Sequence, residues 1–111
     1  MLTFKIKETG EIKTLSLIDP KTRCDYIADF MGNADGLVGL SRTEDGDYLI
    51  NECDYSWWVN VVEATQKADN LEFEYKDALS DEIKEELYKA NFNDFEEVAS
   101  AKISIIEKAI A

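Results

Sequence analysis

Carboxylates are the only abundant reactive side chains in this chain of 111 residues. The sequence holds 24 Asp and Glu residues, two cysteines and no histidine. Without histidine, the chain lacks the side chain that most easily exchanges protons near neutral pH and the commonest nitrogen ligand for zinc. We therefore expect neither zinc chemistry nor a Ser-His-Asp or Cys-His nucleophile. A carboxylate enzyme would require two acids that converge in a cleft, and no spacing in the sequence marks such a pair.

One loop carries part of the spacing of a calcium site. The ligand positions of an EF-hand loop would fall on Ser41, Thr43, Asp45, Gly46 and Glu52. Hydroxyls replace the carboxylates expected at the first two of these positions, and the run at 48–50 is typical of a strand. We therefore interpret the Asp-Gly pair as a hairpin turn. The sequence has no glycine-rich phosphate-binding motif, so it predicts no nucleotide site and no cofactor.

The two cysteines are predicted to be unlinked, structural residues. Cys24 falls on the apolar stripe of an expected helix, and Cys53 precedes another helix, where it would pack on Trp58. The first residues of the chain lack the apolar stretch of a secretion signal. We therefore expect a reducing, cytoplasmic location. No apolar run approaches the roughly 20 residues that a membrane span requires.

All the excess charge lies in the second part of the chain. Residues 44–111 hold eighteen of the acids and six of the 12 Lys and Arg residues, which accounts for the whole formal charge of −12. Such a surface repels nucleic acid and anionic membranes, and it attracts cations or basic proteins over about 8 Å at physiological salt. Direct nucleic-acid binding is not expected, because phosphate contacts require clustered Lys and Arg.

The densest acidic segment supplies the candidate site. Between residues 72 and 97, ten acids are interrupted by only three lysines. Trp57 is the natural aromatic companion, because an aromatic anchor beside a charged rim supplies much of the affinity of many interfaces. The candidate partner-binding residues are Glu72, Glu74, Asp77, Asp81, Glu82, Glu85, Glu86, Glu96, Glu97 and Trp57. The structural alternatives are a solvated helix face for the acids and burial against a sheet for the tryptophan.

Two β-hairpins are predicted from alternating or continuous apolar runs. The first pairs strands at about 2–7 and 11–18 across a Thr-Gly turn. The second pairs 37–40 with 48–50 around the Asp-Gly turn.

A helix is predicted between the hairpins. Asp19 and Pro20 have the residue types of an N-cap and a first helical position, and Gly32 is expected to end the helix after Met31. The spacing assigns its core face to Cys24, Ile27, Ala28 and Met31.

The region after the second hairpin is predicted to be mainly helical. Asp54 is expected to cap a helix that runs to Ala68, with Trp58 on the core face and Trp57 at its edge. The alternation at 71–76 suggests a short strand, although a helical lead-in to the next segment remains open.

Two further helices complete the expected fold. Ser80 is expected to cap a helix at 81–90, in which Ile83, Leu87 and Ala90 face inward and turn the neighbouring acids outward. Asn93 is expected to cap the last helix. Its predicted apolar face comprises Phe95, Val98, Ala99, Ile103, Ile106 and Ile110.

Together these elements predict a single α+β domain over residues 1–111. Its antiparallel sheet has about four strands from two hairpins, with one helix between them and two or three C-terminal helices packed on the sheet. The expected function is a small, non-enzymatic protein-binding module that inhibits a basic, nucleic-acid-binding partner. DNA-mimic antirestriction proteins, anti-CRISPR inhibitors and toxin immunity proteins are of this class. The alternatives are an accessory subunit whose acidity serves solubility and a small carboxylate enzyme.

Overall fold

The first hairpin forms where the sequence predicts it. In the computed structural model, which describes the whole chain, β1 (Leu2–Ile6) pairs antiparallel with β2 (Ile12–Leu15). Gly10 turns the chain with a φ of +76°, a conformation that favours glycine. Phe4 and Ile6 point into the core and are almost fully buried, as the alternation predicts.

The prediction that residues 37–40 and 48–50 pair as the two strands of a second hairpin is wrong. β3 (Tyr48–Ile50) lies parallel to β1, and the strand order is β2-β1-β3. The Asp-Gly turn does form, with Gly46 at a φ of +88°, but residues 37–40 are not a strand. The parallel register places Ile50 beside Ile6 and buries both side chains. The sheet is therefore three-stranded and mixed, and it is not an antiparallel sheet of four strands.

The first helix begins later than predicted. α1 spans Ile27–Asn33, and Asp19 closes a turn instead of capping a helix, because its carboxylate accepts from the backbone N–H of Lys21 at 2.9 Å. Arg23 then has a φ of +64°, which is incompatible with a continuing right-handed helix. The carboxylate of Asp25 accepts from the backbone N–H of Ile27 at 2.9 Å, and α1 starts there.

The late start of α1 changes its predicted core face. Ile27 and Met31 are buried as expected. Cys24 and Ala28 are exposed, so their assignment to the core is wrong. Gly32 lies inside the helix and does not end it.

Asn51 caps α2 (Glu52–Glu74), where Asp54 was expected to do so. Asn51 Oδ1 accepts from the backbone N–H of Asp54 at 2.7 Å, and Asn51 Nδ2 donates to the Asp54 carboxylate at 2.7 Å. Asn51 is therefore the N-cap, and Asp54 is the third helical residue, whose backbone N–H it binds. Cys53 consequently lies inside the first turn and is exposed, so the prediction that it packs on Trp58 is wrong.

The prediction of a strand at 71–76 is wrong. The alternative prediction of a helix is confirmed as far as Glu74, where α2 ends. Leu71 and Tyr75 are one helical turn apart and contact the same small apolar cluster. In a strand Phe73 would share their face, but Phe73 is 39% exposed, so the i, i+4 spacing of the pair and not a period of two decides which side chains are covered. α2 therefore has 23 residues and is about 35 Å long.

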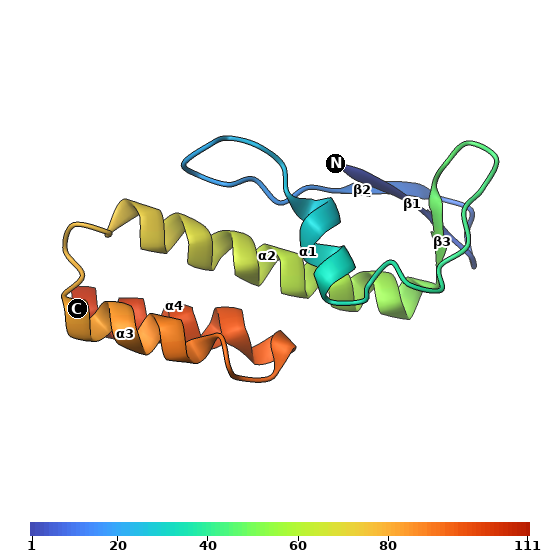
Figure 1. Ribbon diagram of the computed structural model, residues 1–111. Helices are drawn as coiled ribbons and strands as arrows, with labels where there is room; N and C mark the ends of the chain where they lie inside the picture. Colours follow the sequence, from blue (N-terminus) through green and yellow to red (C-terminus); the bar gives the residue numbers. More distant parts are fainter.

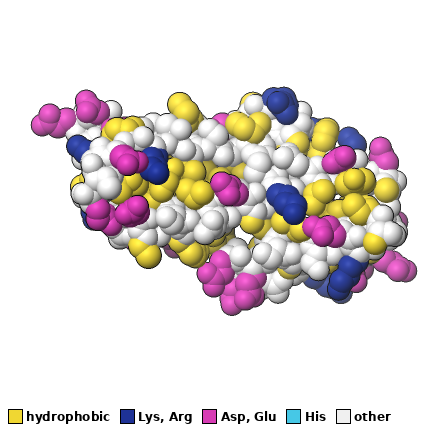
Figure 2. Space-filling view, turned by 180° about the vertical axis from the view of Figure 1, so that it is seen from behind, with side chains coloured by type: hydrophobic (Ala, Val, Ile, Leu, Met, Phe, Trp, Pro, Cys, Tyr) yellow, Lys and Arg dark blue, Asp and Glu magenta, His cyan; other side chains and the backbone are white.

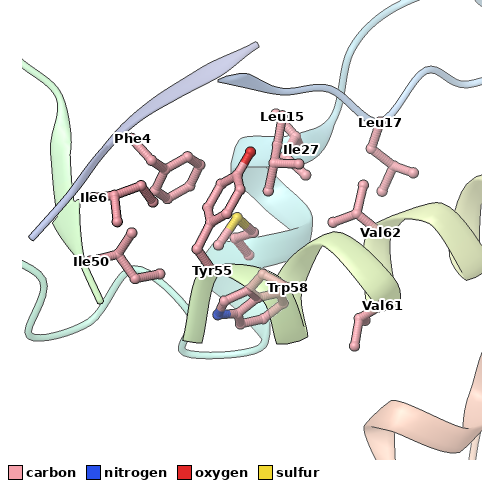
Figure 3. Close-up of a cluster of buried hydrophobic side chains, with 11 residues drawn as sticks. Phe4, Ile6, Leu15, Leu17, Ile27, Ile50, Tyr55, Trp58, Val61 and Val62 are labelled. Atoms are coloured by element: carbon pink, nitrogen blue, oxygen red, sulfur yellow. The ribbon is translucent and has the colours of Figure 1, made fainter. Parts of the chain in front are cut away.

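Separate cores stabilise the two ends of α2. The larger contains eleven buried side chains from the sheet, α1 and the first half of α2 (Figure 3). The smaller contains three, which are Leu79, Leu87 and Ile106. α4 (Val98–Ile110) packs along α2, and α3 (Asp81–Ala90) packs on α4; neither helix packs on the sheet as predicted (Figure 1). The molecule is therefore elongated, with extents of 49 × 26 × 21 Å.

The helix caps in the C-terminal part were predicted with mixed success. Ser80 caps α3 as expected and accepts from the backbone N–H of Ile83 at 3.3 Å. The cap predicted at Asn93 is wrong, because a short 3-10 helix, η1 (Phe95–Glu97), precedes α4. Phe95 and Ile110, which were predicted to lie on the apolar face of the last helix, are exposed.

Candidate protein-interaction surface

The two adjacent tryptophans occupy different environments. Trp58 is 7% exposed, and its ring lies so close to Gly36 that a side chain at that position would clash with it. Trp57 is 40% exposed. Its ring packs edge-on against Trp58 with centroids 4.8 Å apart, and its centroid lies 6.5 Å from that of Phe95. Trp57 is therefore a surface side chain supported by an aromatic base, and it is not buried against the sheet.

A groove runs between α2 and the start of α4, and Trp57 forms part of its lining. It has a volume of about 360 Å³. We call it the Trp57 groove, and its lining residues are Trp57, Asn60, Val61, Ala64, Glu96, Glu97 and Ser100. The indole Nε1 of Trp57 donates to Glu96 Oε2 at 3.3 Å. This contact joins two of the predicted site residues that lie 39 positions apart in the sequence.

The acids of the Trp57 groove have no cationic partner. Glu96 and Glu97 are both exposed, and no Lys or Arg forms an ion pair with either. They lie in η1, immediately before the first turn of α4. The groove therefore combines an aromatic wall with uncompensated negative charge.

The other predicted acids form a second group, at the far end of α2. We call this group the acidic tip, and its members are Glu72, Glu74, Asp77, Asp81, Glu82, Glu85 and Glu86. Along α2, Glu72 lies about 22 Å from Trp57, given a rise of 1.5 Å per residue. The structure thus brings Trp57 together with two of the predicted acids and leaves the remaining seven apart from it.

Most of the acidic tip is exposed and unpaired. Only Glu85 has an ion-pair partner, Lys89, at 3.5 Å and on the surface. Glu72 is half-buried, and the other tip acids are exposed. On the face drawn in Figure 2, however, acidic side chains are dispersed, with Lys, Arg and apolar side chains between them. The acids therefore do not merge into one continuous negative field on that face.

An exposed aromatic pair, Tyr88 on α3 and Phe92 just beyond its end, was not among the predicted site residues. Tyr88 is 64% exposed and Phe92 is 76% exposed, with ring centroids 5.6 Å apart. Phe92 follows Tyr88 by four positions, and this i, i+4 spacing of two aromatic residues is the signal that could have identified them. They place apolar surface beside the acids of α3.

A cleft between the loop before α1 and the end of α2 gathers several titratable groups. Its volume is about 430 Å³, and its lining includes Asp19, Tyr26, Asp69, Glu72 and Lys76. The hydroxyl of Tyr26 donates to the Asp69 carboxylate. Burial raises the pKa of Asp69, and the hydrogen bond from Tyr26 only partly offsets this effect. Burial and the charge of Asp69 raise the pKa of Tyr26.

The contacts around this cleft tie the loop to α2. Beside the Tyr26–Asp69 bond, the side-chain amide of Gln66 both accepts from the backbone N–H of Ile18 and donates to its carbonyl, each at 2.7 Å. A carboxylate with a raised pKa in a cleft has the properties of a candidate acid–base group. Here the group is already engaged by Tyr26. Sequence reasoning missed the tie because its partners are 43 and 48 positions apart.

The structure limits other kinds of site. No three Asp, Glu or Cys side chains converge as the ligands of a metal ion would. Cys24 and Cys53 are both free and exposed. None of the helices combines the length and apolar character needed to cross a bilayer.

Comparison of the chain with protein-family models, with curated proteins and with solved structures found no match. The assignment of a site therefore depends on the geometry of the chain itself. The Trp57 groove and the acidic tip are the candidate surfaces that this geometry supplies.

Proposed function

We propose that this protein is a small acidic binding module that docks on a basic, nucleic-acid-binding protein and blocks its access to nucleic acid. One observation carries the proposal. Of the nine predicted partner-binding acids, eight are exposed and only one has a Lys or Arg partner. Like charges concentrated in this way repel each other and destabilise a compact fold. A basic partner would compensate that repulsion on binding.

The proposed docking is driven by charge and anchored by aromatic contact. Unpaired surface carboxylates raise the rate at which a basic protein associates, and their effect falls as salt screens them. Trp57 offers the aromatic surface that interface anchors commonly provide. Because the molecule is elongated, the Trp57 groove and the acidic tip are separated by about 22 Å along α2. A partner groove that normally holds a nucleic-acid backbone could contact both.

Each alternative function also has an observation in its favour. An accessory subunit would use the exposed Tyr88–Phe92 pair as an apolar contact. A carboxylate enzyme would use the cleft around Asp69, whose pKa is raised by burial. Salt separates the first alternative from the proposal, because an apolar interface persists at high salt and a charge-driven one weakens.

Affinity capture at two salt concentrations tests the proposal. The immobilised protein is incubated with cell lysate at about 0.1 M salt and washed at about 1 M, where the screening length falls to about 3 Å. We expect it to retain basic nucleic-acid-binding proteins at low salt, to release them at high salt, and to lose them to added duplex DNA. Retention of neutral proteins that survive the high-salt wash would contradict the proposal and favour the accessory subunit.

A further inference from the structure

We infer that the Trp57 groove is a socket for an arginine side chain of the basic partner. The inference rests on the proposed function and names the contact through which docking would be anchored. It starts from a feature that charge alone does not explain. A large aromatic side chain is held at the surface directly beside two carboxylates that have no cation.

The groove is shaped before any partner arrives. Trp57 is braced by the edge-on contact with Trp58 and by its hydrogen bond to Glu96. Phe95, which contributes to the same aromatic base, lies next to Glu96 and Glu97 in η1. Because these contacts fix the ring and the backbone that carries the acids, neither loses much conformational entropy on binding.

The chemistry of the lining matches a guanidinium group better than other occupants. Guanidinium is planar, stacks on an indole ring, and donates in parallel to carboxylate oxygens. Glu96 uses Oε2 for the Trp57 indole, which leaves Oε1 as an acceptor, and the Glu97 carboxylate forms no ion pair. A lysine ammonium would satisfy the carboxylates but lacks the flat face that stacks on the ring.

Two other occupants are disfavoured by charge. A purely apolar side chain would dehydrate the rim carboxylates without replacing their hydrogen bonds. A second copy of this chain would bring a further formal charge of −12 to a surface that is already negative. The volume of about 360 Å³ leaves room for an arginine side chain to enter from solvent.

Peptide titration with matched side chains tests the socket. The probes are three short fluorescein-labelled peptides that alternate glycine with arginine, lysine or citrulline, which is the uncharged analogue of arginine. We expect the arginine peptide to bind most tightly, the lysine peptide several-fold more weakly, and the citrulline peptide not measurably. Equal affinity for the arginine and lysine peptides would overturn the inference.

Two charge-matched variants locate the binding site on the protein. Asn60→Lys adds a cation to the exposed lining of the groove, whereas Asn70→Lys adds the same charge to an exposed position of α2 outside it. We expect Asn60→Lys to weaken the arginine peptide about tenfold, which is about 1.4 kcal/mol, and Asn70→Lys to change it less than twofold. Circular dichroism checks that both variants keep the helical content of the wild type.

Failure of the socket and failure of the proposed function give different results. If the arginine peptide binds, is weakened by replacement of tip acids with glutamine, and is equally affected by both lysine variants, the socket is overturned and the acidic module stands. If the arginine peptide binds no better than the citrulline peptide at low salt, both are overturned. Trp57→Phe gives an independent reading, because it should remove the tryptophan fluorescence change that accompanies binding while the buried Trp58 remains.

Discussion

The two ends of α2 are held by very different amounts of buried apolar surface. At the N-terminal end, eleven buried side chains fix the sheet and α1 against the helix. At the end that carries the acidic tip, the core consists of only three buried side chains, which come from α3, α4 and the segment before α3. Apolar burial is the main source of folding stability, at roughly 25 cal/mol per Å². The end with the most concentrated negative charge therefore has the least stabilisation against it. This contrast is expected where charge serves binding more than folding.

The contrast predicts that the C-terminal end unfolds separately when its small core is damaged. Ile106 is fully buried, so Ile106→Ala should cost about 2–5 kcal/mol through lost burial and the cavity left behind. We expect amides of α3 and α4 to lose hydrogen-exchange protection while those of β1 and β2 keep theirs. Ile50→Ala, in the larger core, is the control and should lower protection throughout the chain. Uniform loss in both variants would show that the two cores form one cooperative unit.

The same division separates what could be predicted from the sequence from what could not. The first hairpin and the Ser80 cap were predicted because each depends on residues no more than 13 positions apart. The parallel pairing of β3 with β1 depends on contacts 44 positions apart, such as Phe4 with Tyr48, and no local pattern encodes them. The Asp-Pro signal for a helix start was outcompeted by Asp25, whose carboxylate also binds the backbone N–H of Leu17.

Asp25 should matter most for the stability of the N-terminal end. Asp25→Ala leaves the N–H groups of Leu17 and Ile27 without their acceptor, which should cost about 1–3 kcal/mol at neutral pH. Thermal or denaturant unfolding at pH 7 measures the loss. A variant as stable as the wild type would show that water replaces the carboxylate.

The pH dependence of this effect has a definite sign. Burial alone would raise the pKa of Asp25, but hydrogen bonds from the Met1 amino group and from the backbone N–H groups of Leu17 and Ile27 outweigh it and hold the pKa at about 2. Because this pKa lies below the ordinary 3.8, ionised Asp25 stabilises the fold above that pH. The difference between wild type and Asp25→Ala should therefore shrink as pH falls from about 4 to about 2.

The tie between Tyr26 and Asp69 should have a smaller effect. Tyr26→Phe removes one hydrogen bond and should cost about 1 kcal/mol. The pKa of Tyr26 is raised above the ordinary 10.0, so the neutral phenol stabilises the fold below that pH, and this contribution is lost as pH rises further. Absorbance of tyrosinate during alkaline titration should show the last wild-type transition missing in Tyr26→Phe. If the missing transition is instead an ordinary one near pH 10.0, the tie is not formed in solution.

The candidate site could be predicted only as a set of residue types. Exposure of the acids follows from the inward stripe of α3, which the spacing of Ile83, Leu87 and Ala90 predicts. The division of the acids into the Trp57 groove and the acidic tip does not follow from this spacing, because it depends on where α4 packs along α2. The contact of Trp57 with Glu96 arises from that return.

The smallest expected effect on stability belongs to the acidic tip. Replacement of Glu82, Glu85 and Glu86 by glutamine keeps shape and helix propensity, so the free energy of unfolding should change little or rise slightly as repulsion is relieved. The matched control is E44Q/D45N/D47N, which removes the same number of charges from the turn before β3, at the other end of the molecule (Figure 1). Denaturant unfolding of both variants measures this effect.

The salt dependence of binding by these two variants tests the central claim most directly. Affinity for a basic nucleic-acid-binding protein retained at low salt is measured over a series of salt concentrations for the wild type, the tip variant and the turn control. We predict that the tip variant binds more weakly, by about 1 kcal/mol for each close charge pair lost, with a shallower salt slope, while the turn control stays close to the wild type. An unchanged affinity and salt slope in the tip variant would contradict the claim that these acids form a binding surface.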